Sequence, residues 1–376
     1  MPEYRFDEIA INSKEKKKPT EEDKYTYIGL EHLDTGSLTV SRWGSEIAPT
    51  GEKLVMRKGD VLFGKRRAYQ KKVAIAPFDG IFSAHGMVLR PREEVITKDF
   101  FPLFISSDYF LDEAIKISVG SLSPTINWSD LKELTFTIPT LEEQKKLAPV
   151  IWAAIDTKSA YKKLLLGIDE LVKSQFIERF GDAVNGKEKY PLLSLKDVCS
   201  IIQDGEHATV KRVDKGNLFI SARNIKTDHQ IVLDTVTYIN DENFAKIRKR
   251  FAPKKDDILL TCAGTIGNSA IVPELPPFVA DRGLTMLRPD DSKVLSEYLH
   301  ASIVSDYVQE QMRQGTQATA LAHLYLNKIN AIKIIVPTIE KQKEFVEFLQ
   351  QSDKSKFELT QAISRIDDMI KALMQG

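Results

Sequence analysis

Short apolar runs and longer amphipathic segments follow one another in an order that occurs twice along the chain. In the first half, runs rich in β-branched and aromatic residues are bounded by Gly, Pro and Asp, which is typical of strands, at residues 25–30, 60–64, 72–76 and 86–90. The second half repeats this order at residues 217–222, 257–261, 269–273 and 284–289. Apolar residues at helical spacing occupy segments 99–116 and 295–312. The pattern therefore predicts two tandem α+β domains.

A long segment with heptad spacing follows each predicted domain. It begins after a Pro-Thr pair, and Thr140 with Glu143 predicts a capping box at the start of the first helix. The seam comprises Ile151, Lys158, Tyr161, Leu165, Ile168 and Val172 in the first segment, and Leu349, Lys356, Leu359, Ile363, Ile366 and Ile370 in the second. Each helix would be about 54 Å long at 1.5 Å per residue, which exceeds what one domain needs. We therefore predict that the two helices pack as an antiparallel coiled coil, the alternative being a helix that lies on its own domain.

The two halves also have related sequences. The segment FTIPTLEEQKKLAPVI (136–151) returns as IIVPTIEKQKEFVEFL (334–349), 198 positions later, and a Leu-Arg-Pro triplet recurs at the same distance. This period indicates a duplicated domain, because solenoid repeats have periods of roughly 20 to 50 residues. The predicted boundaries are 1–139 for the first domain, 140–180 for its helix, 181–189 for a linker, 190–337 for the second domain and 338–376 for its helix.

Composition narrows the function classes. Lys plus Arg and Asp plus Glu number 53 each, so any contacts with phosphate must come from local clusters of cations. Neither the two cysteines nor the six histidines have the spacing of a metal site. No run of 18 apolar residues and no secretion signal are visible, so we expect a cytoplasmic protein without a membrane span.

Familiar catalytic motifs are absent from the sequence or incomplete in it. The segment GDVLFGKR (59–66) fits G-x-x-x-x-G-K, but Arg66 replaces the Ser or Thr that would hold magnesium, and the interior is a strand-forming run. No glycine-rich fingerprint follows a strand in a βαβ unit, and no G-x-S-x-G occurs. The sequence therefore predicts a binding protein with no catalytic residues, no metal and no cofactor of its own.

Three polar loops are candidates for contact with a nucleic acid. The loop GKRRAYQKK (64–72) joins two predicted strands and carries Lys65, Arg66, Arg67, Tyr69, Gln70, Lys71 and Lys72. Its cations predict phosphate contacts, and a solvated turn is the alternative. Loops 120–127 and 315–323 occupy matching places in the two domains and carry Ser121, Ser123, Asn127, Thr316, Gln317, Thr319 and His323. Their polar groups suit phosphates and base edges, although plain turns would look the same.

These features together resemble the specificity (S) subunit of type I restriction-modification systems. The resemblance rests on the twice-occurring [IV]-P-T-x-E-x-Q-K at the start of a long helix, on KKDDILLTCAGTIGNSAIV (254–272), and on DGEHATV (204–210), which is similar to a D-G-x-H loop of such subunits. It covers nearly the whole chain and adds the DNA-binding candidates His207, Thr209, Arg223, Asn224, Thr265, Asn268 and Arg282. The first domain has NSKEKKKPT (12–20) in place of the D-G-x-H loop, so the two domains are expected to read different half-sites.

The resemblance implies that this chain recognises DNA and that partner subunits carry out the chemistry. Two target recognition domains would bind double-stranded DNA at a bipartite, asymmetric site, and the helices would set the distance between its halves. Two methyltransferase (M) subunits would bring S-adenosylmethionine, and optional restriction (R) subunits would use ATP, whereas the S chain would bind neither. A coiled-coil scaffold for proteins, or a stand-alone DNA-acting enzyme with an unrecognised site, remain the alternatives.

Overall fold

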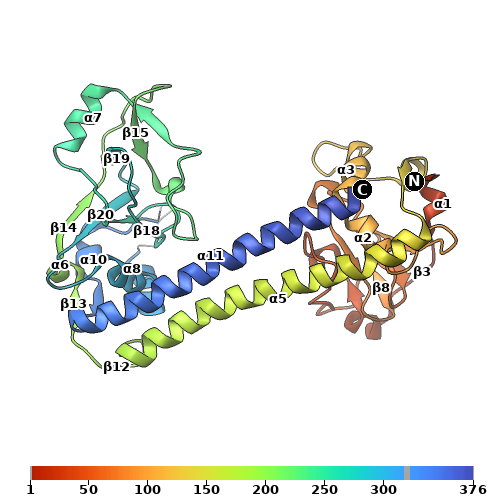
Figure 1. Ribbon diagram of the computed structural model, residues 1–376, viewed down its shortest axis with the longest axis horizontal. Coiled ribbons are helices and arrows are strands. Elements are labelled where there is room, and N and C mark those ends of the chain that lie inside the picture. The colour runs from red at the N-terminus through yellow and green to blue at the C-terminus, as the bar shows by residue number, and fades with distance from the viewer. Residues whose placement is uncertain (1, 317–321, 376) are drawn as a thin grey trace. The chain divides into compact units, whose positions relative to one another are not determined.

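The computed structural model describes residues 2–316 and 322–375 of the chain. The chain divides into two compact units, one formed by Met1–Lys163 with Leu359–Gly376 and the other by Leu164–Glu358. Each unit contains one α+β domain and parts of two long helices, α5 (Leu141–Phe180) and α11 (Ile339–Gln375) (Figure 1). The capping box predicted for α5 is confirmed, because Glu143 accepts from Thr140 N at 2.8 Å and Glu143 N donates to Thr140 Oγ1 at 3.4 Å.

The first domain is built from two four-stranded sheets and a strand pair. One sheet is antiparallel, in the order β2 (Ala10–Ser13), β9 (Met87–Pro91), β6 (Val61–Phe63) and β7 (Val73–Ile75). The other has the order β3 (Lys16–Lys17), β5 (Lys53–Met56), β8 (Gly80–Phe82) and β4 (Tyr27–Ile28), with β4 parallel to β8. The strand pair joins β1 (Glu3–Arg5) to β10 (Thr135–Thr137).

The second domain has a similar arrangement, with three strands instead of four in its second sheet. Its antiparallel sheet has the order β14 (Cys199–Asp204), β20 (Leu284–Pro289), β17 (Ile258–Thr261) and β18 (Ser269–Ile271). A second sheet has the order β16 (Thr237–Ile239), β15 (Asn217–Ile220) and β19 (Phe278–Ala280), with β15 parallel to β19. A strand pair again joins β13 (Leu192–Ser194) to β21 (Lys333–Ile335), and the short pair β11 (Gly181–Asp182) and β12 (Lys187–Glu188) follows α5. All eight predicted strands overlap observed ones, which are shorter than predicted at most sites.

Each predicted domain helix is broken in two. Segment 99–116 forms α2 (Phe101–Ser106) and α3 (Asp108–Lys116), and segment 295–312 forms α8 (Ser296–Val304) and α9 (Asp306–Gly315). The breaks fall at Ser107 and Ser305, whose backbones are extended with ψ 148. Ser107 accepts from Phe110 N, so it caps α3 instead of continuing α2. A Ser-Asp-Tyr triplet at both breaks is the signal that periodicity alone overlooks.

The remaining helices are short. The described helical turns are α1 (Phe6–Ile9), α4 (Trp128–Leu131), α6 (Leu195–Val198), α7 (Asp241–Arg248), α10 (Leu326–Ala331), η1 (Glu21–Tyr25), η2 (Leu30–His32), η3 (Ala68–Gln70) and η4 (Ala222–Asn224). In each unit, the start of one long helix and the end of the other pack on the domain core. Ala148 and Ile151 of α5 and Ile370 of α11 join the first core. Phe176 of α5 contacts Phe345 of α11 in the second, with ring centroids 5.6 Å apart.

A buried glutamine fixes each helix start to its domain, which explains why Gln recurs in both halves. The Gln144 side chain donates to Val95 O (3.0 Å) and Pro139 O (2.8 Å) and accepts from Thr97 N (2.8 Å). Gln342 donates to Lys293 O (2.9 Å) and Pro337 O (3.0 Å) and accepts from Leu295 N (2.9 Å). Every partner is displaced by the same 198 positions, and both side chains are fully buried.

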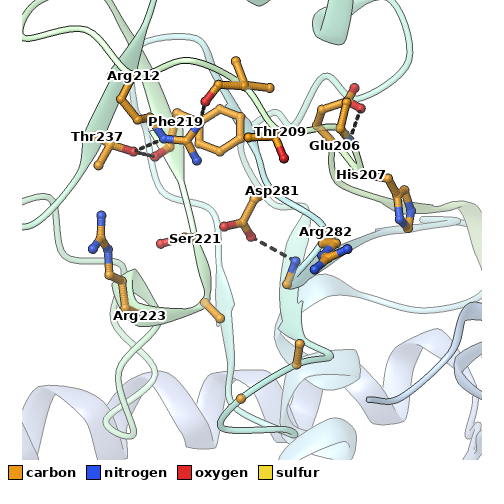
Figure 2. A pocket seen from close by; sticks show the side chains of 16 residues that line it. Glu206, His207, Thr209, Arg212, Phe219, Ser221, Arg223, Thr237, Asp281 and Arg282 are labelled. Atoms are coloured by element: carbon orange, nitrogen blue, oxygen red, sulfur yellow. Dashed lines mark hydrogen bonds between the residues drawn. The ribbon is translucent and has the colours of Figure 1, made fainter. Parts of the chain in front are cut away.

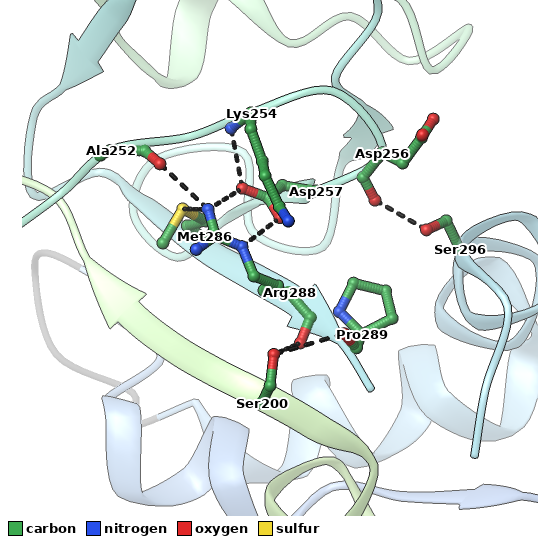
Figure 3. Close-up of polar contacts among 9 residues, drawn as sticks. All are labelled: Ser200, Ala252, Lys254, Asp256, Asp257, Met286, Arg288, Pro289 and Ser296. Carbon is green, nitrogen blue, oxygen red and sulfur yellow. Dashed lines mark hydrogen bonds and ion pairs between the residues drawn. The ribbon is translucent and has the colours of Figure 1, made fainter. Parts of the chain in front are cut away.

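A bidentate ion pair explains the repeated Leu-Arg-Pro triplet. Arg288 donates from Nε and Nη2 to Asp257 at 2.8 and 2.7 Å, and Asp257 also accepts from Lys254 N (Figure 3). In the first domain Arg90 pairs with Asp60 at 2.8 and 2.9 Å. Both carboxylates are buried. The ion pair therefore joins β9 to the start of β6 in the first domain and β20 to the start of β17 in the second.

Candidate nucleic-acid interface

In the first domain, two candidate loops that are far apart in the sequence lie against one another. Ile126 N donates to Lys65 O at 2.9 Å, and Ala68 N donates to Pro124 O at 3.2 Å. Arg66 Nε donates to Ser123 Oγ at 3.1 Å. The loops 64–72 and 120–127 therefore form one surface, which we call the basic turn surface.

The cations of the basic turn surface are not equivalent. Lys71 lies between Asp108 (2.8 Å) and Asp112 (2.7 Å), and Lys72 Nζ donates to Leu30 O at 2.6 Å. These two lysines hold the turn to α3 and η2, and the charge of Lys71 is paired with two carboxylates, whereas Lys72 donates to a neutral carbonyl. Arg66 and Arg67 are exposed instead. Phosphate contact by this loop stays a prediction, and Arg66 and Arg67 are its most exposed cations.

The other candidates of this surface differ in accessibility. Lys65 is half-buried, and burial together with the nearby Lys16 lowers the pKa of its ammonium. Tyr69 is 57% exposed, and Ser121 and Asn127 are exposed as well. Gln70 is half-buried, and its carbonyl accepts from Thr35 Oγ1. Tyr69 and Ser121 are therefore the accessible neighbours of the two arginines.

The second domain contains a cavity of about 590 Å³ that brings four predicted residues together. His207 and Thr209 come from the loop after β14, Arg223 from η4, and Arg282 from the segment after β19 (Figure 2). Arg223 and Arg282 are exposed, and neither side chain has a hydrogen-bonding partner among the described residues. Four positions spread over 76 residues of sequence thus share one cavity wall.

Two further residues of this cavity were not predicted. Arg212 stacks on Phe219, 3.9 Å from the ring centroid, and donates to Thr237 Oγ1 (3.1 Å) and Val210 O (2.6 Å). Asp281 accepts from Gly283 N at 2.9 Å, and its burial raises the pKa of its carboxyl. Both lie in segments without a sequence motif. The pairing of β15 with β19 brings them together, because Arg212 stacks on Phe219 of β15 and Asp281 directly follows β19.

The first two residues of the D-G-x-H loop, Asp204 and Gly205, have structural roles. Asp204 is buried and accepts from Thr285 Oγ1 at 2.6 Å. A Cβ atom on Gly205 would lie 2.1 Å from Asp281 O, so only glycine fits there. Arg250 donates to Gly205 O at 3.0 Å and holds the loop from its other side. His207, 58% exposed, is left to face the cavity.

The structure contradicts the prediction that Asn224 binds DNA. Its side chain is fully buried, accepts from Ser221 N (3.0 Å) and donates to Val232 O (3.0 Å), so it holds η4 in place and cannot reach DNA. Thr265 is exposed and Asn268 is half-buried, and their carbonyls accept from Thr261. Neither side chain is brought into the cavity.

The third candidate loop is described in part. Thr316 Oγ1 donates to Met312 O at 2.6 Å, which ties it to the end of α9. The His323 ring packs edge-on against the Tyr325 ring, with centroids 4.7 Å apart. A β-bridge between His323 and Ala263, a residue that lines the cavity, places His323 beside the cavity. Gln317 and Thr319 lie outside the described residues.

The predicted seam positions are all buried or half-buried. Lys158 donates to Asp367 within the first unit, and Lys356 pairs with Asp169 at 2.5 Å within the second. Both partners of one pair are 198 positions from their counterparts in the other, so the duplication also relates the ion pairs.

The sequence matches the family described as the type I restriction modification DNA specificity domain twice, over residues 4–164 and 187–366. The chain belongs to this family. It is similar to the type I restriction enzyme EcoDI specificity subunit of Escherichia coli, with 28% identity over 145 residues that make up 38% of this chain and 32% of that protein. With the StySPI specificity subunit of Salmonella potsdam the identity is 20% over 357 residues, 88% of this chain and 74% of that protein.

Solved structures of this family share the fold. A chain from work on the complex assembly and conformational transition of the type I R-M system has a TM-score of 0.62 at 16% identity, covering 100% of this chain and 96% of that one. The S subunit of a type I system from M. genitalium has a TM-score of 0.56 at 17% identity, covering 99% and 96%. Alignments with the first curated relatives span about a third of their length.

None of the described helices combines the length and the apolarity that crossing a membrane requires. Within residues 2–316 and 322–375, no three His, Cys, Asp or Glu side chains gather where a metal ion could bind.

Proposed function

We propose that this chain is a specificity subunit that binds a bipartite, asymmetric DNA site, with one half-site for each target recognition domain. The observation that carries the proposal is the duplication itself: two copies of one fold, each clamped to a long helix by a buried glutamine, with different exposed polar groups. A protein built this way is suited to reading two separated sequences on successive faces of a duplex. The chain itself catalyses no reaction.

The proposal includes an antiparallel coiled coil of α5 and α11 as the spacer. Two observations support it: no seam position is fully exposed, and the ion pairs of Lys158 with Asp367 and of Lys356 with Asp169 are duplicated. A lysine in a seam costs stability but fixes the register of the two helices. The predicted boundaries then describe the recognition domains as 1–139 and 190–337, the spacer helices as 140–180 and 338–376, and a linker as 181–189.

Partner subunits supply the chemistry in this proposal. Two M subunits would bring S-adenosylmethionine, R subunits would use ATP, and this chain would bind neither cofactor. On DNA, Arg66 and Arg67 would neutralise phosphates in the first half-site, and the cavity of the second domain would face the other half-site. The candidates Ser121, Tyr69 and His323 lie beside these positions.

The test is methylation by the complex of this chain with M subunits on targets whose spacer is changed by one base pair. One base pair rotates one half-site by roughly a tenth of a turn and shifts it along the axis, so a rigid spacer should no longer engage both halves. We expect methylation to be abolished. A contiguous target, or tolerance of any spacer length, would contradict the proposal, and methylation by the chain alone would identify an enzyme instead.

A further inference from the structure

The two domains carry the same local site at the end of their parallel strands. In the first domain β4 pairs with β8 so that Ile28 lies opposite Phe82; in the second, β15 pairs with β19 so that Ile220 lies opposite Ala280. In both domains, the backbone N–H of the residue that follows this strand donates to the neighbouring strand. Ser83 N donates to Ile28 O at 3.0 Å, and Asp281 N donates to Ile220 O at 3.1 Å. Ser83 and Asp281 are therefore equivalent, although the loops before them differ in length.

A one-turn 3-10 helix completes each site. It follows β4 as η2 and β15 as η4, and its last side chain bonds back to the residue before the turn. His32 Nδ1 accepts from Gly29 N at 2.9 Å, and Asn224 Oδ1 accepts from Ser221 N at 3.0 Å. The middle residues are thereby equivalent: Glu31 in the first domain and Arg223 in the second. Both are exposed, and neither has an ion-pair partner among the described residues.

The exposed residues differ in charge although the backbone hydrogen bonds are the same. Glu31 stands where the second domain has Arg223, and Ala84 stands where it has Arg282. The residues that hold the turn keep the same task in both domains, since Ser83 and Asp281 each accept from the N–H two positions later, at 3.3 and 2.9 Å. The site thus keeps its scaffold and changes only its outward chemistry.

Each site adjoins a surface that we propose above to contact DNA. In the first domain Lys72 of the basic turn surface donates to Leu30 O, which places Glu31 next to that surface. In the second domain Arg223 and Arg282 line the cavity with His207. An exposed carboxylate beside a basic surface would be repelled by phosphates, but it is a good acceptor for the amino group of a base.

We propose that Glu31 and Arg223 are equivalent specificity-determining residues that read base edges in the first and second half-sites, an inference that rests on the proposed function. Arg223, an exposed guanidinium that lines the cavity, presents the paired donors that match guanine O6 and N7. Glu31 presents an acceptor that matches the amino group of cytosine N4. The two turns would therefore select different bases on the strand that they face, cytosine in the first half-site and guanine in the second.

The experiment uses the full chain in complex with M subunits and two DNA libraries, each randomised in one half-site, with methylation read by sequencing. We expect Glu31→Gln to relax one position of the first half-site and leave the second unchanged, and Arg223→Gln to do the converse. A lost bidentate contact should reduce discrimination on the order of 10-fold to 100-fold. Arg223→Lys should also lose discrimination, because an ammonium cannot match both acceptors.

Matched exposed controls are Glu22→Gln and Lys249→Gln, which should leave both half-sites unchanged. Thermal unfolding of each variant separates loss of reading from loss of fold. A uniform fall in methylation on all sequences would mean that Arg223 contacts phosphate, and would overturn the inference. Unchanged preferences in both variants, while the wild-type complex still selects a bipartite site, would sink this inference alone. A wild-type complex without a bipartite site would overturn the proposed function with it.

Discussion

Replacing Gln342 by Ala should destabilise the second unit more than any exposed substitution on the same helix. The side chain is fully buried and makes three hydrogen bonds, two to carbonyls and one from Leu295 N. Alanine leaves these three backbone groups without partners. Each lost bond to a buried group costs about 1 kcal/mol on balance and more where water cannot replace it.

The three bonds together predict a loss of about 3 kcal/mol in the free energy of unfolding. With a urea slope of about 2 kcal/mol per M, the midpoint should fall by about 1.5 M. The matched control is Gln351→Ala, because Gln351 is an exposed residue of α11. Glutamine and alanine have similar helix propensities, so that control should move the midpoint little.

The assay is urea unfolding of the full chain, followed by circular dichroism and by fluorescence. Gln144→Ala removes the equivalent clamp of the first unit, and the two losses should add because the sites share no partner. A midpoint for Gln342→Ala within experimental error of the Gln351→Ala midpoint would refute the view that the clamp fixes the helix to its domain.

Two further predictions concern charge. Arg66→Gln and Arg67→Gln should each lower the slope of log affinity against log salt by about 0.9 in DNA-binding titrations, whereas Lys71→Gln should leave the slope unchanged and lower stability, because Lys71 is held by Asp108 and Asp112. Burial and the neighbouring His229 lower the pKa of His300 to about 4, so the folded chain binds fewer protons than the unfolded one between pH 4 and 6.5. Stability should therefore be complete above pH 6.5 and fall by up to about 3 kcal/mol as the pH drops to 4, and His300→Gln should remove that part of the pH dependence of urea unfolding.

Local patterns predicted eight strands and the two long helices, because strand and helix periodicities depend on near neighbours, but strands such as β2 and β14 were not predicted. They failed where one residue changes the backbone, as at Ser107, which lies within an apolar helical pattern and yet starts a new helix. They also treated Lys71 and Arg67 alike, since nothing in a run of cations tells which one has a carboxylate beside it in the fold.

The recognition site was harder to predict than the frame for a related reason. The frame repeats at one constant spacing, so Gln144 and Gln342 identify one another directly. Glu31 and Arg223 are 192 positions apart rather than 198, because the segments between the strands differ in length. Their equivalence depends on strand register and on a backbone hydrogen bond, which sequence comparison within the chain does not contain.

The duplicated features fall into two groups with different consequences for specificity. Those kept in both halves are mainly buried and join a helix or strand to its domain, as the glutamine clamps and the Arg–Asp pairs do. Those that differ are exposed and lie on a turn whose own hydrogen bonds are kept, as Glu31 and Arg223 do. Replacing Glu31 or Arg223 should therefore reduce the free energy of unfolding little, since it breaks no hydrogen bond within the turn. Changing a clamp instead alters how firmly a domain is held on its helix, and so whether both half-sites are engaged at once, without altering which bases each domain prefers.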